Sequence, residues 1–285
     1  MKILVTGSNG MLGKDLLPLL RERHEPVGIT RTEADITDEL QVRHAIQGTS
    51  PEIVIHAAAM TAVDDCELRP ELAFKANAEG TRHVAAACAE LGVPMFYVST
   101  DYVFDGEKAE PYVETDQTHP VSIYGKSKLE GENHVRTLLS RFWIARTSWV
   151  FGPFGKNFVE AILGKARQGA TLRVVDDQVG CPTYTADLAR KIVEIIELGR
   201  PGLYHISNQG SCSRFEFACE ILRQAGIDPA LVLPVPTSAS DRPARRPMNS
   251  RLANRKLEEE ELGLLPDWKD ALCRYLRRKP PVPKG

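Results

Sequence analysis

The sequence lacks the features that would indicate a metal site, a disulfide scaffold or a membrane span. Its six cysteines are scattered through 285 residues without a C-x-x-C pair, which favours free thiols in a cytoplasmic protein. Its apolar runs fall short of the ~20 residues that cross a bilayer. We expect the first strand to start at Lys2, which leaves no room for a signal peptide. The formal net charge of -2 favours neither nucleic acid nor an anionic membrane as a partner.

The apolar segments that are present alternate between strand-like and helix-like patterns. Predicted strands cover 2–6, 26–30, 52–56, 94–99 and 142–146, and predicted helices cover 10–23, 39–47, 70–91 and 122–139. Such alternation implies parallel strands joined by right-handed crossovers. The sequence therefore predicts an α/β fold with a Rossmann-type doubly wound parallel sheet.

A glycine-rich turn follows the first predicted strand. Its pattern is Gly7-x-x-Gly10-x-x-Gly13, one residue longer in the first spacing than G-x-G-x-x-G. Gly7 would permit the tight turn, Gly10 would let the backbone approach a phosphate, and Gly13 would let the helix pack closely on the strand. A strand, this turn and a helix in succession indicate a dinucleotide site, although a glycine turn without a ligand has the same pattern.

The residues at the end of the second predicted strand indicate which cofactor is preferred. Enzymes that prefer NAD usually carry an acid there for the ribose hydroxyl, whereas this chain has Arg31 followed by Thr32. Because a guanidinium can pair with a 2′-phosphate, we expect NADPH to be preferred over NADH. The alternative is that Arg31 is a solvated surface residue. Asp35 and Ile36 are expected at the adenine edge, and the small residues Ala57, Ala58 and Ala59 would let the cofactor lie against the backbone.

A tyrosine and a lysine four residues apart supply the chemistry. Tyr124 and Lys128 share one helix face, and Thr100 ends the fourth strand. A free tyrosine titrates near ~10. A neighbouring ammonium and the positive charge of oxidised nicotinamide favour the phenolate, so we expect Lys128 and the cofactor to lower the pKa of Tyr124. This grouping indicates hydride transfer with a tyrosine that handles the proton.

The composition changes after Val150, where glycine and proline become frequent and the predicted helices become shorter. We expect residues 1–150 to form the dinucleotide-binding domain. Residues 151–285 would form mainly a smaller C-terminal substrate-binding lobe, partly interleaved with the first domain because 203–206 can return to the main sheet. The tail 279–285 is rich in proline and lysine and is expected to be frayed.

Over nearly its whole length the sequence resembles the extended short-chain dehydrogenase/reductases, and more narrowly the dTDP-4-dehydrorhamnose reductases. Two of its strings are rather specific to that subfamily, and the others are shared with related sugar-nucleotide enzymes. The specific strings are Ser99-Thr-Asp-Tyr-Val-Phe104 and Arg146-Thr-Ser-Trp-Val150; the shared ones include Ala57-Ala-Ala-Met-Thr-Ala-Val-Asp64, Tyr124-Gly-Lys-Ser-Lys128, Asp177-Gln-Val-Gly-Cys-Pro-Thr183 and Arg246-Pro-Met-Asn-Ser250.

The resemblance implies a set of site residues. Thr100, Tyr124 and Lys128 would be the catalytic group, and the cofactor would also contact the glycine turn, including Asn9, Met11 and Leu12. Asp101 and Trp149 would touch the sugar nucleotide, unless Trp149 belongs to the core. Arg242 and Arg246, with the neighbouring Arg245, could hold the substrate's diphosphate by forked hydrogen bonds.

The implied reaction is the reduction of the C4 ketone of dTDP-4-dehydro-β-L-rhamnose by NADPH or NADH. A 4,6-dehydratase is disfavoured because Asp101 is followed by Tyr102 instead of a second acid. A 4-epimerase, another nucleotide-sugar 4-ketoreductase, and a non-catalytic NADP-binding subunit resembling the regulatory subunit of methionine adenosyltransferase are the remaining alternatives. The sequence leaves open a homodimer and the use of a divalent ion such as Mg.

Overall fold

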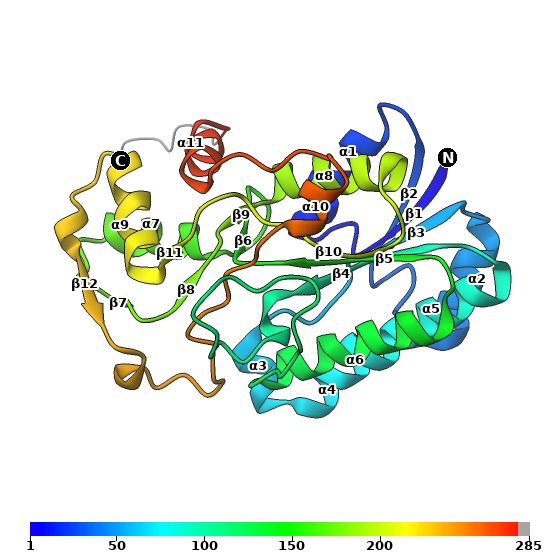
Figure 1. Cartoon of the computed structure of the whole chain (residues 1–285), viewed down its shortest axis with the longest axis horizontal. Coiled ribbons are helices and arrows are strands. Elements are labelled where there is room, and N and C mark those ends of the chain that lie inside the picture. The colour runs from blue at the N-terminus through cyan, green and yellow to red at the C-terminus, as the bar shows by residue number, and fades with distance from the viewer. Residues whose placement is uncertain (279–285) are drawn as a thin grey trace.

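A six-stranded parallel sheet forms the centre of the molecule (Figure 1). The computed structural model describes residues 1–278, so the predicted tail 279–285 lies outside the described residues. The strand order is β10-β5-β4-β3-β1-β2. The chain adds β2 on one side of β1 and the later strands on the other side, which is the doubly wound arrangement. This topology confirms the predicted fold class. The strands are β1 (Lys2–Thr6), β2 (Glu25–Ile29), β3 (Ile53–His56), β4 (Met95–Thr100), β5 (Phe142–Thr147) and β10 (Gly202–His205).

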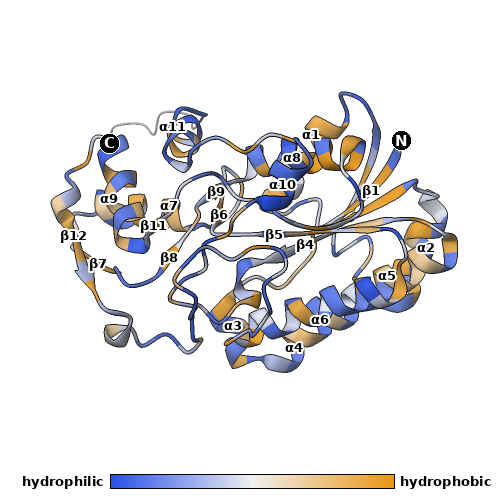
Figure 2. Cartoon of the chain, in the orientation of Figure 1, coloured by the Kyte–Doolittle hydropathy of each residue, from blue (hydrophilic) through white to orange (hydrophobic). Residues whose placement is uncertain are grey.

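Helices cover both faces of this sheet, above and below it in Figure 1. Side chains of α1 (Met11–Leu20) and α8 (Thr185–Leu198) share one buried cluster with Ile3 and Val5. Side chains of α2 (Glu39–Thr49), α5 (Gly80–Leu91) and α6 (Ile123–Leu138) share another with Leu4. Figure 2 shows mainly apolar strands between helices that also carry polar residues, as expected for a sheet buried on both faces.

A smaller lobe lies beside the sheet, on the left of Figure 1, and has its own buried cluster. Its parallel ribbon of β7 (Leu172–Val175) and β12 (Val232–Val235) packs with α7 (Phe158–Arg167) and α9 (Arg214–Gln224). The remaining short strands pair as β6 (Val150–Phe151) with β9 (Thr183–Tyr184), and β8 (Val179–Gly180) with β11 (Cys212–Ser213). The helices α10 (Arg255–Glu259) and α11 (Trp268–Arg278) follow.

One region differs from the sequence-based expectation, and another agrees with it. The predicted helix 70–91 is divided into α4 (Pro70–Phe74), a π-helical stretch (Lys75–Glu79) and α5, and a further short helix, α3 (Val63–Leu68), precedes it. Periodicity alone gives no signal for a π turn. Strand β10 joins the central sheet, as expected for residues 203–206, and helix α8, which also follows residue 150, packs against that sheet. The division of the chain at residue 150 stays a prediction.

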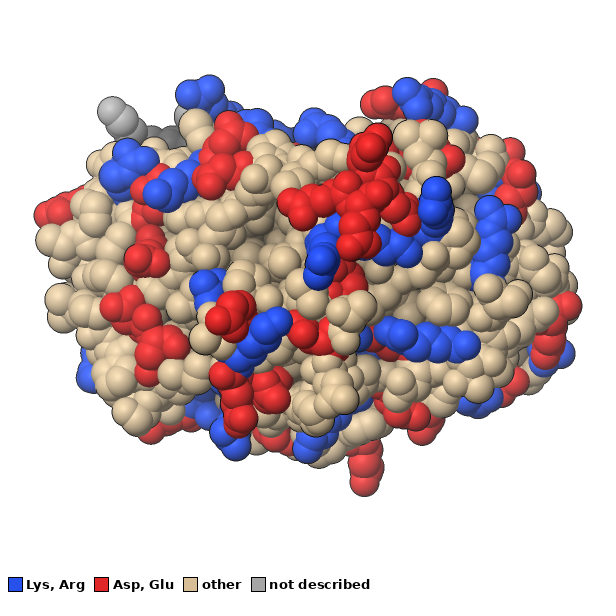
Figure 3. All heavy atoms as spheres, in the orientation of Figure 1, with Lys and Arg blue, Asp and Glu red and all other residues tan. Residues whose placement is uncertain are grey.

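The surface carries charges of both signs. Figure 3 shows acidic and basic side chains mixed over the face drawn, with acidic ones gathering over α10, where Glu258 to Glu261 follow one another. This face therefore presents no broad field of one sign. None of the helices within residues 1–278 is both long and apolar enough to cross a membrane.

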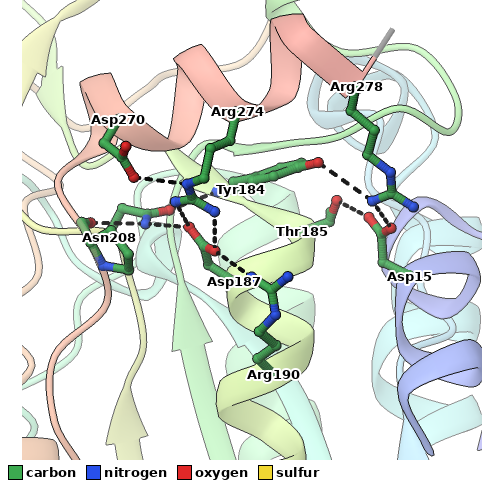
Figure 4. Close-up of polar contacts among 10 residues, drawn as sticks. Asp15, Tyr184, Thr185, Asp187, Arg190, Asn208, Asp270, Arg274 and Arg278 are labelled. Carbon is green, nitrogen blue, oxygen red and sulfur yellow. Dashed lines mark hydrogen bonds and ion pairs between the residues drawn. The ribbon is translucent and has the colours of Figure 1, made fainter.

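Buried carboxylates fasten α11 to α8 and α1 (Figure 4). Asp187 of α8 is 4% exposed and accepts two hydrogen bonds from Arg274, at 2.6 and 2.7 Å, and one from Asn208 at 2.8 Å. Asp15 of α1 accepts hydrogen bonds from Thr185 and from Arg278. The last described helix is thus tied to the helix that follows the glycine turn.

We predict that Asp187→Asn lowers the free energy of unfolding by about 3 kcal/mol, because it leaves the Arg274 guanidinium without its buried counter-charge. Asp270→Asn is the matched control, since Asp270 also binds Arg274 but its side chain is 57% exposed. That variant should lose less than about 1 kcal/mol. Urea unfolding of both proteins measures the difference, and equal losses would contradict this assignment.

Candidate active site

The glycine turn brings the end of β1 against the chain that follows β3. Gly7 has a φ of +69°, and a Cβ on it would lie 2.8 Å from the Ala58 Cα. A Cβ on Gly13 would lie 2.5 Å from the Gly7 carbonyl oxygen, so helix α1 can pack this closely only with glycine. Gly10 caps α1 without a side-chain hydrogen bond, which leaves the first N–H groups of the helix available to an anion.

Helix α6 starts where it can present Tyr124 to the end of β4. The Ser122 hydroxyl caps the helix by accepting a hydrogen bond from the Gly125 N–H at 3.2 Å. A Cβ on Gly125 would lie 2.1 Å from the Tyr102 carbonyl oxygen. This close approach sets the Tyr124 ring edge-on to the Tyr102 ring, with centroids 5.8 Å apart.

The phenol of Tyr124 has a raised pKa, where the sequence led us to expect a lowered one. Burial is the largest cause, and the negative charge of Asp101 adds to it, while a hydrogen bond with the Thr100 side chain opposes it. The net shift is therefore opposite to the expected one, because burial outweighs the neighbouring charges of the chain. The sequence spacing of Tyr124 and Lys128 does not show how far either side chain is removed from water.

The ammonium of Lys128 is held against β4. Lys128 is 2% exposed and donates a hydrogen bond to the Val98 carbonyl oxygen at 2.8 Å, with its Nζ 4.1 Å from the centre of the Tyr97 ring. Burial lowers the pKa of Lys128 to about 7, although the Glu132 carboxylate raises it. Proton exchange at Lys128 is therefore accessible near neutral pH.

Thr100 is oriented by a buried carboxylate. Its hydroxyl donates to Asp101 Oδ1 at 3.0 Å, and the Ser148 hydroxyl donates to Asp101 Oδ2 at 2.9 Å. Burial raises the pKa of Asp101, which is 2% exposed. The contact of Asp101 with a sugar nucleotide stays a prediction, because the oxygens of Asp101 already serve neighbouring hydroxyls.

Asn77, in the π-helical stretch, is a positioning residue that the sequence analysis missed. Its side chain accepts a hydrogen bond from the Met60 N–H at 2.8 Å and donates to the Met60 carbonyl oxygen and to the Ser127 hydroxyl, each at 3.0 Å. Ser127 in turn donates to the Tyr124 carbonyl oxygen. Asn77 thus links the chain after β3 to the helix that carries Tyr124 and Lys128. π turns occur frequently at functional sites, but no local sequence pattern predicted this one.

A cavity of about 420 Å³ joins the glycine turn to the tyrosine. Its walls also contain Thr147, whose buried hydroxyl has no hydrogen-bond partner within residues 1–278. The predicted site residues that line the cavity are Gly7, Gly10, Met11, Leu12, Gly13, Ala57, Ala59, Thr100, Asp101, Tyr124, Lys128 and Trp149.

Five predicted cofactor contacts lie outside this cavity. Asn9 is exposed, and Ala58 lies beneath Gly7. Ile36 is 8% exposed and would contact a Cβ on Gly80 of α5. Arg31 and Asp35 form an ion pair of 3.0 Å at the end of β2, and the Arg31 side chain is 83% exposed. The roles of these residues stay predictions.

A second cavity, of about 910 Å³, adjoins the first and contains Arg242 and Arg246 in its walls. Lys156 and Arg214 line both cavities. The sequence analysis missed Arg214, whose guanidinium lies 3.4 Å from the centre of the Trp149 ring. Nothing in the local sequence connects α9 with Trp149, because only the tertiary fold brings them together.

Trp149 is part of the cavity wall and also packs on the lobe. It is half-buried, and its φ of +45° is left-handed, a strained conformation for a large side chain. A Cβ on Gly180 would lie 2.3 Å from the indole, so this glycine makes room for the ring. Trp149 therefore stands between Gly180 and Arg214, at the junction of the two cavities.

No metal centre is formed by the residues that the structure describes. Groups of three or more His, Cys, Asp or Glu side chains suited to a metal are absent from residues 1–278, and the six cysteines there are free thiols. The prediction of free thiols is confirmed.

A family model described as the RmlD substrate binding domain matches residues 1–279. The chain belongs to this family. Spore coat polysaccharide biosynthesis protein SpsK of Bacillus subtilis is 40% identical over 280 residues, which are 98% of each chain. A dTDP-4-dehydrorhamnose reductase of Streptomyces griseus is 41% identical over 276 residues, covering 94% of this chain and 91% of the relative.

A solved structure extends the RmlD-family match to three dimensions. The dTDP-4-dehydrorhamnose reductase of Bacillus anthracis, solved in complex with NADP, is similar with a TM-score of 0.95 and 39% identity, over 98% of this chain and 99% of that one. These matches confirm the resemblance that the sequence strings indicated.

The pKa of Lys128 can be tested through folding stability. Since burial lowers this pKa from 10.5 to about 7, the folded chain binds fewer protons at Lys128 than the unfolded chain between these pH values. The contribution of Lys128 to stability should therefore rise with pH across this interval. We predict that Lys128→Met removes that rise, measured as the difference from wild type in urea unfolding at pH 6.5, 8 and 9.5.

Lys126→Met is the matched control, since Lys126 is exposed on the same helix. That variant should keep the wild-type dependence of stability on pH. A Lys128→Met protein with the wild-type dependence would show that the ammonium is not desolvated.

Proposed function

We propose that this protein reduces the C4 ketone of dTDP-4-dehydro-β-L-rhamnose to dTDP-β-L-rhamnose, with NADPH preferred over NADH. The observation that carries the proposal is one cavity that contains the glycine turn together with Thr100, Tyr124 and Lys128. The S. griseus and B. anthracis relatives, both named dTDP-4-dehydrorhamnose reductase, support the choice of substrate.

The glycine turn fits a dinucleotide. Side chains at Gly7 and Gly13 would fill the space between β1, α1 and the chain after β3, whereas the glycines leave the backbone free to approach a pyrophosphate. The uncapped N-terminus of α1 supplies N–H groups and a positive dipole end for its charge. The reduced nicotinamide, when bound, supplies the hydride for the carbonyl carbon.

Tyr124 supplies the proton in this proposal. Its raised pKa keeps the phenol protonated at neutral pH, as a proton donor requires. The Thr100 hydroxyl lines the same cavity, and its single proton, which Asp101 Oδ1 accepts in this structure, would have to turn to the substrate oxygen to stabilise the negative charge that develops there. Lys128, whose pKa burial lowers to about 7, lines the same cavity as Tyr124 and donates a hydrogen bond to the Val98 carbonyl oxygen.

The geometry also bears on the rival functions. Asp101 is the only acid among the residues that line the smaller cavity, within the described part of the chain, and its oxygens accept hydrogen bonds from Thr100 and Ser148. A dehydratase would need a second acid, and Tyr102 stands at the next position. A 4-epimerase regenerates its cofactor, and a regulatory subunit binds without turnover, so stoichiometry separates both from a reductase.

The test is turnover of purified protein with the dTDP-4-keto sugar and NADPH. A reductase oxidises one NADPH for each dTDP-rhamnose formed. Interconversion of dTDP-rhamnose and its C4 epimer without net consumption of cofactor would favour the epimerase, and binding of both ligands without turnover would favour the regulatory subunit.

The proposal also places the protein in the cytoplasm, with a nucleotide sugar as its small-molecule partner and a homodimer as its assembly. Size-exclusion chromatography with light scattering decides the assembly.

We predict that Tyr124→Phe lowers kcat by a factor of roughly 100 to 10,000, the usual contribution of a positioned acid. NADPH should still bind, as measured by quenching of tryptophan fluorescence. Tyr102→Phe removes another phenol hydroxyl from the same cavity and should cost less than about tenfold, because that hydroxyl is not the proton donor. Near-normal turnover of Tyr124→Phe would overturn its role.

The end of β2 gives a prediction on the choice of cofactor. Arg31 can make two charge-assisted hydrogen bonds to a 2′-phosphate, but it shares its charge with Asp35 at 3.0 Å. The carboxylate of Glu33, which the sequence analysis did not consider, accepts hydrogen bonds from the Thr30 N–H and hydroxyl beside it. We therefore expect only about a tenfold preference for NADPH in kcat/KM, equivalent to ~1.4 kcal/mol.

Arg31→Ala should remove most of that preference and leave turnover with NADH nearly unchanged. Arg21→Ala, an exposed arginine beyond α1, is the control and should keep the wild-type ratio. If Arg31→Ala keeps the ratio as well, the ribose is recognised elsewhere.

A further inference from the structure

One carboxylate in the wall of the larger cavity, that of Asp64, contacts two arginines that line the same cavity. Asp64 lies in the first turn of α3, in the chain that follows β3. Its Oδ1 accepts a hydrogen bond from Arg246 Nη2 at 2.9 Å, and its Oδ2 accepts one from Arg242 Nη1 at 3.1 Å. The Ala244 N–H also points to Oδ1, at 3.4 Å. Asp64 therefore fastens the loop that carries both arginines to the sheet domain.

The two arginines differ in how firmly they are held. The Arg246 side chain is 12% exposed, whereas that of Arg242 is 65% exposed. Arg246 Nη1 also donates to the Ala244 carbonyl oxygen at 2.9 Å. A guanidinium has five N–H donors, and within residues 1–278 the Arg246 guanidinium makes hydrogen bonds only to Asp64 and Ala244. Arg246 is thus an oriented cation in the wall of the cavity, with N–H groups that can bind a ligand.

Arg246 lies in a cavity that adjoins the cavity containing Tyr124. Arg246 lines the larger cavity, which meets the smaller one at Val63, Tyr102, Lys156 and Arg214. A nucleotide sugar whose ketone lies at Tyr124 would extend its diphosphate towards this junction. Arg214 and Lys156 add positive charge there, and Asp64 lowers the net charge while it fixes the geometry.

We propose that Asp64 is a positioning residue for the substrate's diphosphate, which holds Arg246 so that its free donors meet the phosphate oxygens. The inference rests on the proposed function and deepens it. The pKa of Asp64 is lowered by the hydrogen bond and charge of Arg246, against the opposing effect of partial burial. The carboxylate that makes these contacts is therefore ionised at neutral pH.

If the Asp64 carboxylate is removed, an effect of its charge and an effect of its positioning role should change KM for the nucleotide sugar in opposite directions. Removing a negative charge beside a diphosphate weakens repulsion, so an effect of charge alone would lower KM for the nucleotide sugar. Loss of the ion pair frees the Arg246 side chain, which must then lose rotamer freedom on binding, so a positioning role raises KM.

The test is Asp64→Asn, in which one oxygen becomes an NH₂ group that cannot accept a hydrogen bond from a guanidinium. We expect KM for the nucleotide sugar and Kd for dTDP to rise about tenfold, or ~1.4 kcal/mol, with KM for NADPH unchanged. Asp65→Asn is the matched control, because Asp65 lines the same cavity but pairs with Arg69. It removes the same charge and should leave KM unchanged or slightly lower. An Asp64→Asn protein that behaves like Asp65→Asn overturns the inference.

A second variant tests the route through Arg246. Arg246→Lys keeps the charge but loses the fork, so it should also raise KM for the nucleotide sugar, whereas Arg173→Lys, at an exposed arginine that lines the same cavity, should not. In the Arg246→Lys background, Asp64→Asn should have little further effect. An unchanged KM in Arg246→Lys, or additive effects in the double variant, contradicts the positioning role. Failure of the proposed function is distinguishable, because the wild-type protein would then not turn over the keto sugar.

Discussion

The site depends on a buried ion pair between Glu132 of α6 and Arg146 of β5. Arg146 donates to both carboxylate oxygens of Glu132, at 2.9 and 2.8 Å, and the Ser99 hydroxyl of β4 donates to the same carboxylate at 2.6 Å. Both charged side chains are at most 2% exposed. Leaving one such partner unpaired costs about 3–5 kcal/mol, so the pair gives α6 one position over β4 and β5.

That position sets the electrostatics of the reacting groups. With α6 fixed, Lys128 is desolvated against the Val98 carbonyl oxygen, and Tyr124 is desolvated beside Thr100 and Asp101. Burial then moves the two pKa values in opposite directions, since it disfavours the cation of one and the anion of the other. Both shifts therefore have one cause, which is the loss of water around α6.

Local patterns predicted much of this arrangement. The first five strands, the glycine turn and the helix of Tyr124 were predicted because each depends on neighbours in sequence. The contacts of Asp64 with Arg242 and Arg246 could not be predicted, since the residues lie far apart in the chain.

The missed features have the same physical origin. Arg214 contacts Trp149 only in the folded lobe, and the π turn at Asn77 has no periodic signal. The direction of the Tyr124 pKa shift was wrong because spacing gives the proximity of a cation but not the loss of water.

Hydride transfer to the C4 ketone is tested most directly by following deuterium from NADPH into the product sugar. The protein would be supplied with NADPH carrying deuterium at C4 of the nicotinamide, on the face that it transfers, and with the dTDP-4-keto sugar. The account predicts that deuterium appears at C4 of the product sugar, one atom for each cofactor oxidised, while the hydroxyl proton comes from solvent. Product without deuterium at C4, or deuterium at another sugar carbon, would contradict hydride transfer to the C4 ketone.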